Sequence, residues 1–115
     1  MKNQLETLLL ANDNILFAYL FGSYADHTFN DSSDIDIAVY LKDYSFDSKL
    51  SLHHALEKSL QKEVDLVCLN EIKNIYLLES ILTRGIMIKE SKERAIFEVE
   101  KHHAIIDFKK YIDAA

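Results

Sequence analysis

The chain of 115 residues is long enough for one domain with a hydrophobic core and too short for two, so we expect a single domain over residues 1–115. Hydrophobic residues make up 49% of the chain and charged residues 28%, a usage that excludes a disordered protein. The net charge of −6 argues against direct nucleic-acid binding, because a phosphate backbone is held by a surplus of Lys and Arg.

The same survey predicts a cytoplasmic protein without a membrane partner. The N-terminal residues 1–14 lack the continuous apolar stretch of a signal peptide, and no run approaches the length of a membrane span. The single cysteine, Cys68, lies in the apolar run VDLVCL and excludes an internal disulfide. We expect it to pack as a small hydrophobic side chain.

The first elements in chain order are a short helix and a buried strand. Leu5, Leu8 and Leu9 recur at helical spacing before the pattern breaks at residues 12–14. Residues 15–21, ILFAYLF, form a continuous apolar run that stops at Gly22, which is typical of a buried central strand.

The next strand carries a period of two. In DIDIAVYL the branched residues at 35, 37, 39 and 41 alternate with Asp34, Asp36, Ala38 and Tyr40. Both aspartates therefore point to the same face of the predicted sheet.

The rest of the chain predicts three helices and two strands. A helix is expected over residues 48–61, followed by the strand EVDLVCL, which carries Asp65. A further helix has Ile75, Leu78 and Leu82 on one face. Gly85 caps that helix before the strand IMIK. Residues 91–113 close the chain as a long helix, with Ile105, Phe108 and Ile112 at helical spacing. The expected class is α/β (α+β), a small mixed sheet packed with helices.

The turn after the first strand is a candidate phosphate site. Ser23 follows Gly22 where a strand passes into a turn, and free backbone N–H groups with a hydroxyl bind phosphate oxygens at such places. The glycine lets a ligand approach the backbone closely.

Three carboxylates form the second half of the candidate site. Asp34 and Asp36 direct two oxygen ligands to one point, and Asp65 on a neighbouring strand supplies a third. Mg²⁺ binds to a few carboxylates together with phosphate oxygens. These parts are those needed for in-line attack on a nucleoside triphosphate. A purely structural interpretation, in which Gly22 and Ser23 only turn the chain, stays open on spacing alone.

The stretch GSYADHTFNDSSDIDIAVYL resembles the Gly-Ser, ten residues, Asp-x-Asp signature of the DNA polymerase beta-like nucleotidyltransferase superfamily. Within it, the chain is similar to minimal nucleotidyltransferase (MNT) domains over nearly its whole length. EVDLVCL matches the strand with the third carboxylate, and residues 93–112 resemble the C-terminal helix of MNT antitoxins. The resemblance implies a polymerase beta-like fold with an extra C-terminal helix.

The resemblance also implies an activity and a partner. MNT antitoxins are encoded with HEPN-domain ribonuclease toxins, and transfer of AMP from ATP to a tyrosine of that partner is expected. Gly22 and Ser23 would bind the triphosphate, Asp34 and Asp36 would bind Mg²⁺, and Asp65 would share the metal and help to activate the acceptor hydroxyl. These three aspartates are the expected catalytic residues.

One departure keeps other functions open. Where many relatives continue Gly-Ser with Ala-Arg-Gly, this chain has Ala25, Asp26 and His27, so an anion replaces a cation near the expected phosphates. A binding-only antitoxin with a decayed site therefore remains possible, as does a nucleotidyltransferase for a small molecule. The second alternative needs a further domain to hold its acceptor.

Aromatic and histidine residues near these motifs have simpler interpretations. Tyr24 follows Ser23 and is expected to pack in the core rather than stack on a base. His53, His54, His102 and His103 lie on predicted helices without zinc-like spacing and are expected to be exposed or partly packed.

Overall fold

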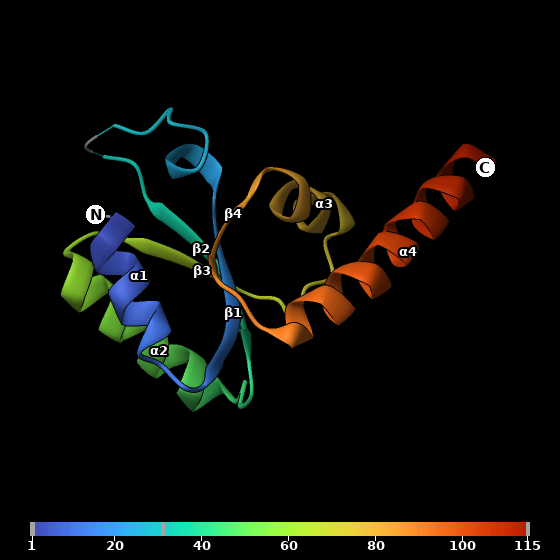
Figure 1. Ribbon diagram of the computed structural model, residues 1–115. Helices are drawn as coiled ribbons and strands as arrows, with labels where there is room; N and C mark the ends of the chain where they lie inside the picture. Colours follow the sequence, from blue (N-terminus) through green and yellow to red (C-terminus); the bar gives the residue numbers. More distant parts are fainter. Residues whose placement is uncertain (1, 31, 115) are drawn as a thin grey trace.

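The computed structural model describes residues 2–30 and 32–114, which alternate between helices and strands (Figure 1). The elements are α1 (Lys2–Leu10), β1 (Ile15–Phe21), the short 3₁₀ helix η1 (Gly22–Tyr24), β2 (Ile35–Leu41), α2 (Phe46–Leu60), β3 (Val64–Cys68), α3 (Ile75–Arg84), β4 (Ile86–Lys89) and α4 (Lys92–Ala114). Within these residues one four-stranded sheet has the order β3-β2-β1-β4. Strands β2 and β3 are parallel, and β1 is antiparallel to both of its neighbours. The predicted mixed α/β fold is confirmed.

Helices cover both faces of the sheet. Helices α1 and α2 lie on one face, and α3 and the first half of α4 lie on the other (Figure 1). Strand β1 is central and buried on both faces, with Ala18 and Leu20 in the first core and Phe17 and Tyr19 in the second. The prediction of a buried central strand is therefore confirmed.

The alternation predicted for β2 is also confirmed. Its branched and leucine side chains, Ile35, Ile37, Val39 and Leu41, lie in the core beneath α1 and α2. Ala38 and Tyr40 lie in the core beneath α3 and α4. Because side chains alternate along a strand, Asp36 also belongs to the α3 and α4 face.

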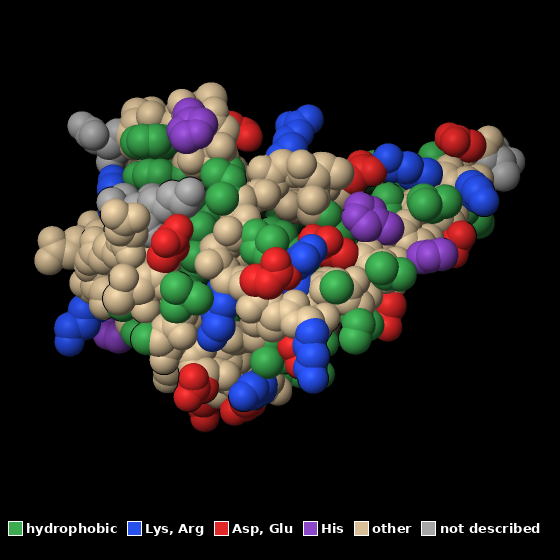
Figure 2. Space-filling model, in the orientation of Figure 1, with side chains coloured by type: hydrophobic (Ala, Val, Ile, Leu, Met, Phe, Trp, Pro, Cys, Tyr) green, Lys and Arg blue, Asp and Glu red, His purple; other side chains and the backbone are tan. Residues whose placement is uncertain are grey.

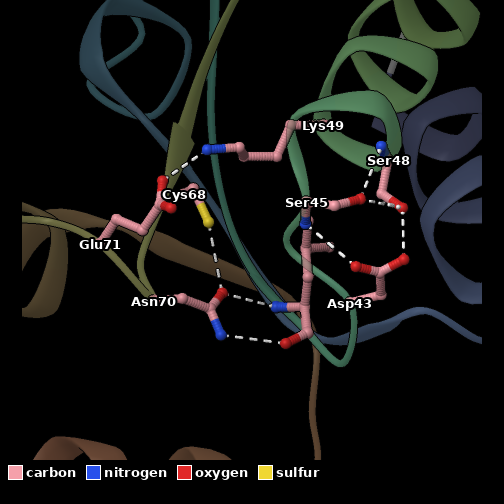
Figure 3. Close-up of polar contacts among 8 residues, drawn as sticks. Asp43, Ser45, Ser48, Lys49, Cys68, Asn70 and Glu71 are labelled. Atoms are coloured by element: carbon pink, nitrogen blue, oxygen red, sulfur yellow. Dashed lines mark hydrogen bonds and ion pairs between the residues drawn. The ribbon is translucent and has the colours of Figure 1, made fainter.

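Helix α2 begins two residues before the predicted start because of its N-cap. Ser45 Oγ accepts the N–H of Ser48, and Asp43 accepts both the N–H of Ser45 (3.0 Å) and the hydroxyl of Ser48 (2.7 Å) (Figure 3). An N-cap side chain satisfies backbone donors that have no partner within the helix. Gln61, with φ of 54°, ends the helix at Leu60.

The far end of β2 is held by the turn that follows β3. Asn70 accepts the N–H of Leu41 and donates to its carbonyl, both at 2.9 Å (Figure 3). Lys49 of α2 forms an ion pair with Glu71 in the same turn. These contacts hold β3 in register along β2.

Gly85 follows α3 as predicted, but its backbone is not left-handed. Its φ is −65°, and its N–H donates to the carbonyl of Ile81. A Cβ at this position would lie 2.4 Å from that carbonyl oxygen, so glycine is needed for close packing rather than for a positive φ.

Helix α4 covers Lys92–Ala114 and extends beyond the body of the molecule (Figure 1). Its first half is core, because Phe97 and Ile105 are buried and the ring of Phe97 lies 5.3 Å from that of Phe17. Tyr19 also donates from its hydroxyl to Glu98 (2.5 Å). Within the described residues, no helix has the length and apolar character required to cross a membrane.

Candidate active site

Strand register brings the glycine turn against an aspartate. Phe21, the last residue of β1, pairs with Asp36 near the start of β2, and Gly22 follows directly. Gly22 has φ of 71°, and a Cβ built on it would lie 2.1 Å from Oδ2 of Asp36. Only glycine fits there, both because side chains disfavour this backbone region and because the carboxylate occupies the space. The predicted phosphate turn is therefore in contact with the carboxylate of Asp36.

The hydrogen bonds within the turn do not use the N–H groups at its start. Ala25 and Asp26 both donate from their backbone N–H to the carbonyl of Gly22 (3.1 Å each), and Thr28 donates to the carbonyl of Ser23 (2.9 Å). The N–H groups of Ser23 and Tyr24 precede these donors in the chain. Backbone N–H groups in such turns form concave anion sites.

The third predicted carboxylate is brought to the same place. Strands β2 and β3 are parallel with Asp36 opposite Asp65, so the two side chains share one face. Asp34 lies immediately before β2 and is exposed, as is Asp65, whereas Asp36 is half-buried. Gly22, Asp36 and Asp65 thus follow one another across three adjacent strands.

The crowded carboxylates change the acidity of the central one. The pKa of Asp36 is raised from 3.8 to about 6, mainly by burial and then by the charges of Asp65 and Asp34 and a hydrogen bond with Asp65. Like charges near each other disfavour ionisation unless a cation compensates them.

The chemistry of these donors fits a divalent cation, although the geometry is incomplete. Carboxylate oxygens are the ligands that Mg²⁺ prefers. Within residues 2–30 and 32–114, however, no group of three or more His, Cys, Asp or Glu side chains is already arranged around one metal position. Asp36 and Asp65 form a close pair, and Asp34 acts on it through its charge. Coordination of one ion by all three therefore requires side-chain rotation.

Two residues of the turn depart from the family pattern quoted above. The side chain of Asp26 is exposed beside the turn. His27 has φ of 59°, a left-handed conformation that glycine adopts without strain and that a residue with a side chain adopts less readily. Tyr24 is buried and its ring stacks on Phe29 at 4.4 Å, so the packing interpretation of this residue is confirmed.

Sequence reasoning did not find the α2 side chains beside Asp65. Nε2 of His53 lies 2.7 Å from the carbonyl of Val64, and Glu57 accepts the N–H of Val64 at 2.9 Å. Their spacing of four residues on a helix before a strand was a possible signal. His53 is partly packed and the other three helical histidines are exposed, as expected.

The family model described as "Polymerase beta, Nucleotidyltransferase" matches residues 3–94. The chain belongs to the polymerase beta nucleotidyltransferase family. The matched segment of this nucleotidyltransferase contains Gly22, Ser23 and all three aspartates of the candidate site.

Among curated proteins, the chain is 36% identical over 88 residues to protein adenylyltransferase MntA of Shewanella oneidensis. The alignment covers 72% of this chain and 62% of MntA, so this nucleotidyltransferase spans less than two thirds of that relative.

Solved structures match over nearly the whole length. A toxin-antitoxin structure with AMP-PNP is 29% identical with a TM-score of 0.77, covering 98% of this chain and 96% of the other. A tri-AMPylated Shewanella oneidensis HEPN toxin in complex with MNT antitoxin gives 27% identity and a TM-score of 0.69, covering 98% and 93%. The fold of this nucleotidyltransferase is therefore that of the matched chains.

We predict that Asp36→Asn stabilises the metal-free protein at about pH 7.5 by roughly a few degrees in melting temperature. The folded protein holds the Asp36 proton more tightly than the unfolded chain does, since its pKa is raised to about 6. The folded state therefore loses stability as the pH rises from about 4 to about 6, and the amide removes this loss. Thermal unfolding with a chelator present measures the difference.

The exposed Asp34→Asn serves as the matched control and should shift the melting temperature less. At about pH 4 the parent and Asp36→Asn should unfold at similar temperatures, because both then carry a neutral group there. A destabilised Asp36→Asn at about pH 7.5 would show that this carboxylate is not under charge strain.

Proposed function

We propose that this chain is an antitoxin that transfers AMP from ATP to a tyrosine of a HEPN-domain toxin and so neutralises it, in the cytoplasm where ATP is available. The observation that carries the proposal is the contact of Gly22 with Asp36, which itself lies opposite Asp65. The similarity to MntA and to toxin-antitoxin structures, one with AMP-PNP and one with a tri-AMPylated toxin, supports the donor and the partner.

Different residues of the site bind the triphosphate and the metal. The N–H groups and hydroxyl of the turn at Gly22 and Ser23 bind triphosphate oxygens. Asp34, Asp36 and Asp65 would hold Mg²⁺. When bound, Mg²⁺ neutralises phosphate charge and lowers the pKa of an acceptor hydroxyl. The same ion relieves the repulsion among the carboxylates.

Asp65 orients the acceptor hydroxyl and accepts its proton. The hydroxyl oxygen forms a bond to the α-phosphorus while the bond between that phosphorus and the α,β-bridging oxygen breaks. Pyrophosphate leaves, and AMP remains on the acceptor. Asp65 is suited to this role because it lies at the open edge of the sheet and is exposed, whereas Asp36 is half-buried.

A binding-only antitoxin is the second candidate. Asp26 places an anion beside the turn, and the carboxylates are not preassembled around a metal position within the described residues. An anion near the phosphates would weaken triphosphate binding by charge repulsion.

In both candidate functions, the enzyme and the binding-only antitoxin, the partner docks on the outer face of α4. Ile96, Val99 and Ile106 are 61%, 60% and 51% exposed and lie on the side of the helix away from Phe97 and Ile105. Apolar side chains gather along this helix in Figure 2. A helix that is apolar on two faces has more apolar surface than one core needs, and continuous apolar surface marks interaction sites.

We predict that Asp65→Asn keeps the partner bound but lowers AMP transfer by about two orders of magnitude or more, because the substitution removes the proton acceptor and keeps the shape. Intact-mass analysis of the co-expressed HEPN partner measures the transfer as added AMP. Glu63→Gln is the matched control, since Glu63 is an exposed carboxylate two residues away.

Equal transfer by Asp65→Asn and the parent would remove Asp65 from the mechanism. If the parent leaves the partner's mass unchanged with ATP and Mg²⁺ and still neutralises the toxin in cells, the binding-only antitoxin replaces the enzyme.

We predict that Val99→Glu with Ile106→Glu weakens partner binding at least about tenfold, because the new charges are buried on docking. Both residues are exposed, so the melting temperature of the isolated chain should hardly change. Calorimetry measures the affinity, and Leu10→Glu on α1, which is 55% exposed, is the control. Unchanged affinity in the double variant would place the partner elsewhere.

A further inference from the structure

A groove follows the open edge of the sheet beside the candidate active site. Strand β3 is the edge strand, and α2 lies next to it. The groove has a volume of about 410 Å³ and is lined by Phe46, Lys49, Leu50 and His53 on α2 and by residues 64–66 on β3. Asp65 lines the groove between Val64 and Leu66, while its side chain lies with that of Asp36 on the α3 and α4 face of the sheet.

The backbone of β3 alternates between its neighbour and the groove. Ile35 donates to the carbonyl of Glu63 (3.0 Å), and Leu69 donates to the carbonyl of Val39 (2.8 Å), so odd-numbered residues of β3 face β2. Val64 and Leu66 then direct their N–H and C=O groups to the open edge.

Val64 and Leu66 differ in the partners of these outward groups. The N–H and C=O of Val64 are bonded by Glu57 and His53 of α2. No group within residues 2–30 and 32–114 is bonded to the outward pair of Leu66. An edge strand with open backbone groups is a template for a further strand.

We propose that this groove receives an extended segment of the acceptor protein, which adds to the edge of β3 at Leu66 and presents its hydroxyl at Asp65. The inference rests on the proposed function and names the route by which its acceptor reaches the site. The proposal is based on the position of the groove, because a segment bound in it passes Asp65. In the proposed mechanism, Asp65 accepts the hydroxyl proton as AMP is transferred and pyrophosphate leaves.

The walls of the groove suit an apolar or aromatic side chain of that segment. Phe46 and Leu50 are 73% and 53% exposed, which is costly for large apolar side chains unless a partner covers them. In strand addition the main chain supplies affinity, and pockets for alternate side chains supply specificity. Because His53 and Glu57 already hold the edge at Val64, the groove is formed before the acceptor arrives.

Steady-state transfer of AMP to the HEPN partner, with ATP and partner varied separately, tests this route. Leu50→Glu should raise the KM for the partner at least about tenfold and leave the KM for ATP unchanged, because a carboxylate in the groove opposes burial. Phe46→Ala removes the aromatic wall without adding charge and should act in the same direction, which guards against a folding defect in either variant. Leu10→Glu, an exposed leucine outside the groove, is the control.

The possible outcomes distinguish a failure of the proposed function from a failure of the groove proposal. A parent that transfers no AMP contradicts the proposed function. A parent that transfers AMP together with groove variants that keep the parent's KM for the partner overturns the groove alone. A rise in the KM for ATP in Leu50→Glu would also overturn it, since the groove would then bind the nucleotide.

Discussion

The antiparallel register of β1 on β2 is the constraint on which the site depends. It places Phe21 opposite Asp36 and hence Gly22 against the carboxylate of Asp36. The parallel register of β2 on β3 then places Asp65 opposite Asp36. A slip of one residue in either pairing would turn an aspartate to the other face of the sheet. The contacts at the far end of β2, above all Asn70 on Leu41, oppose such a slip.

The same register concentrates negative charge. Asp36 is held half-buried between two other carboxylates, and its pKa is raised as a result. Crowding of this kind lowers the stability of the metal-free protein, because like charges close together disfavour ionisation. In the proposed function, metal binding by Asp36 and the stability of the metal-free protein therefore oppose each other. In contrast, Asp65 is exposed on the edge strand of the sheet.

Local patterns were sufficient to predict most of the fold. The apolar run of β1 and the alternation of β2 report burial directly, so both strands and the two faces of β2 followed from the sequence. The start of α2 was wrong by two residues because Ser45 and Asp43 supply caps ahead of the periodic segment. Gly85 was correctly placed after α3, but its close packing on Ile81 is a tertiary contact that local pattern does not show.

The candidate site could be predicted only in its composition. Strand register decides which residues lie close together. The contact of Gly22 with Asp36 is visible only when β1 and β2 are paired. The groove beside Asp65 depends on α2 packing near the sheet edge, and no spacing in the sequence encodes that distance. The second apolar face of α4 was likewise hidden, because periodicity does not separate core residues from residues that face a partner.

A crystal structure with Mn²⁺ and a non-hydrolysable ATP analogue, recorded at a wavelength where manganese scatters anomalously, tests the central claim most directly. We predict an anomalous peak coordinated by Asp36 and Asp65, with the side chain of Asp34 rotated towards it, and phosphate oxygens on the N–H groups of Ser23 and Tyr24. An analogue bound away from this turn, or manganese without these carboxylates among its ligands, would contradict the assignment of the site.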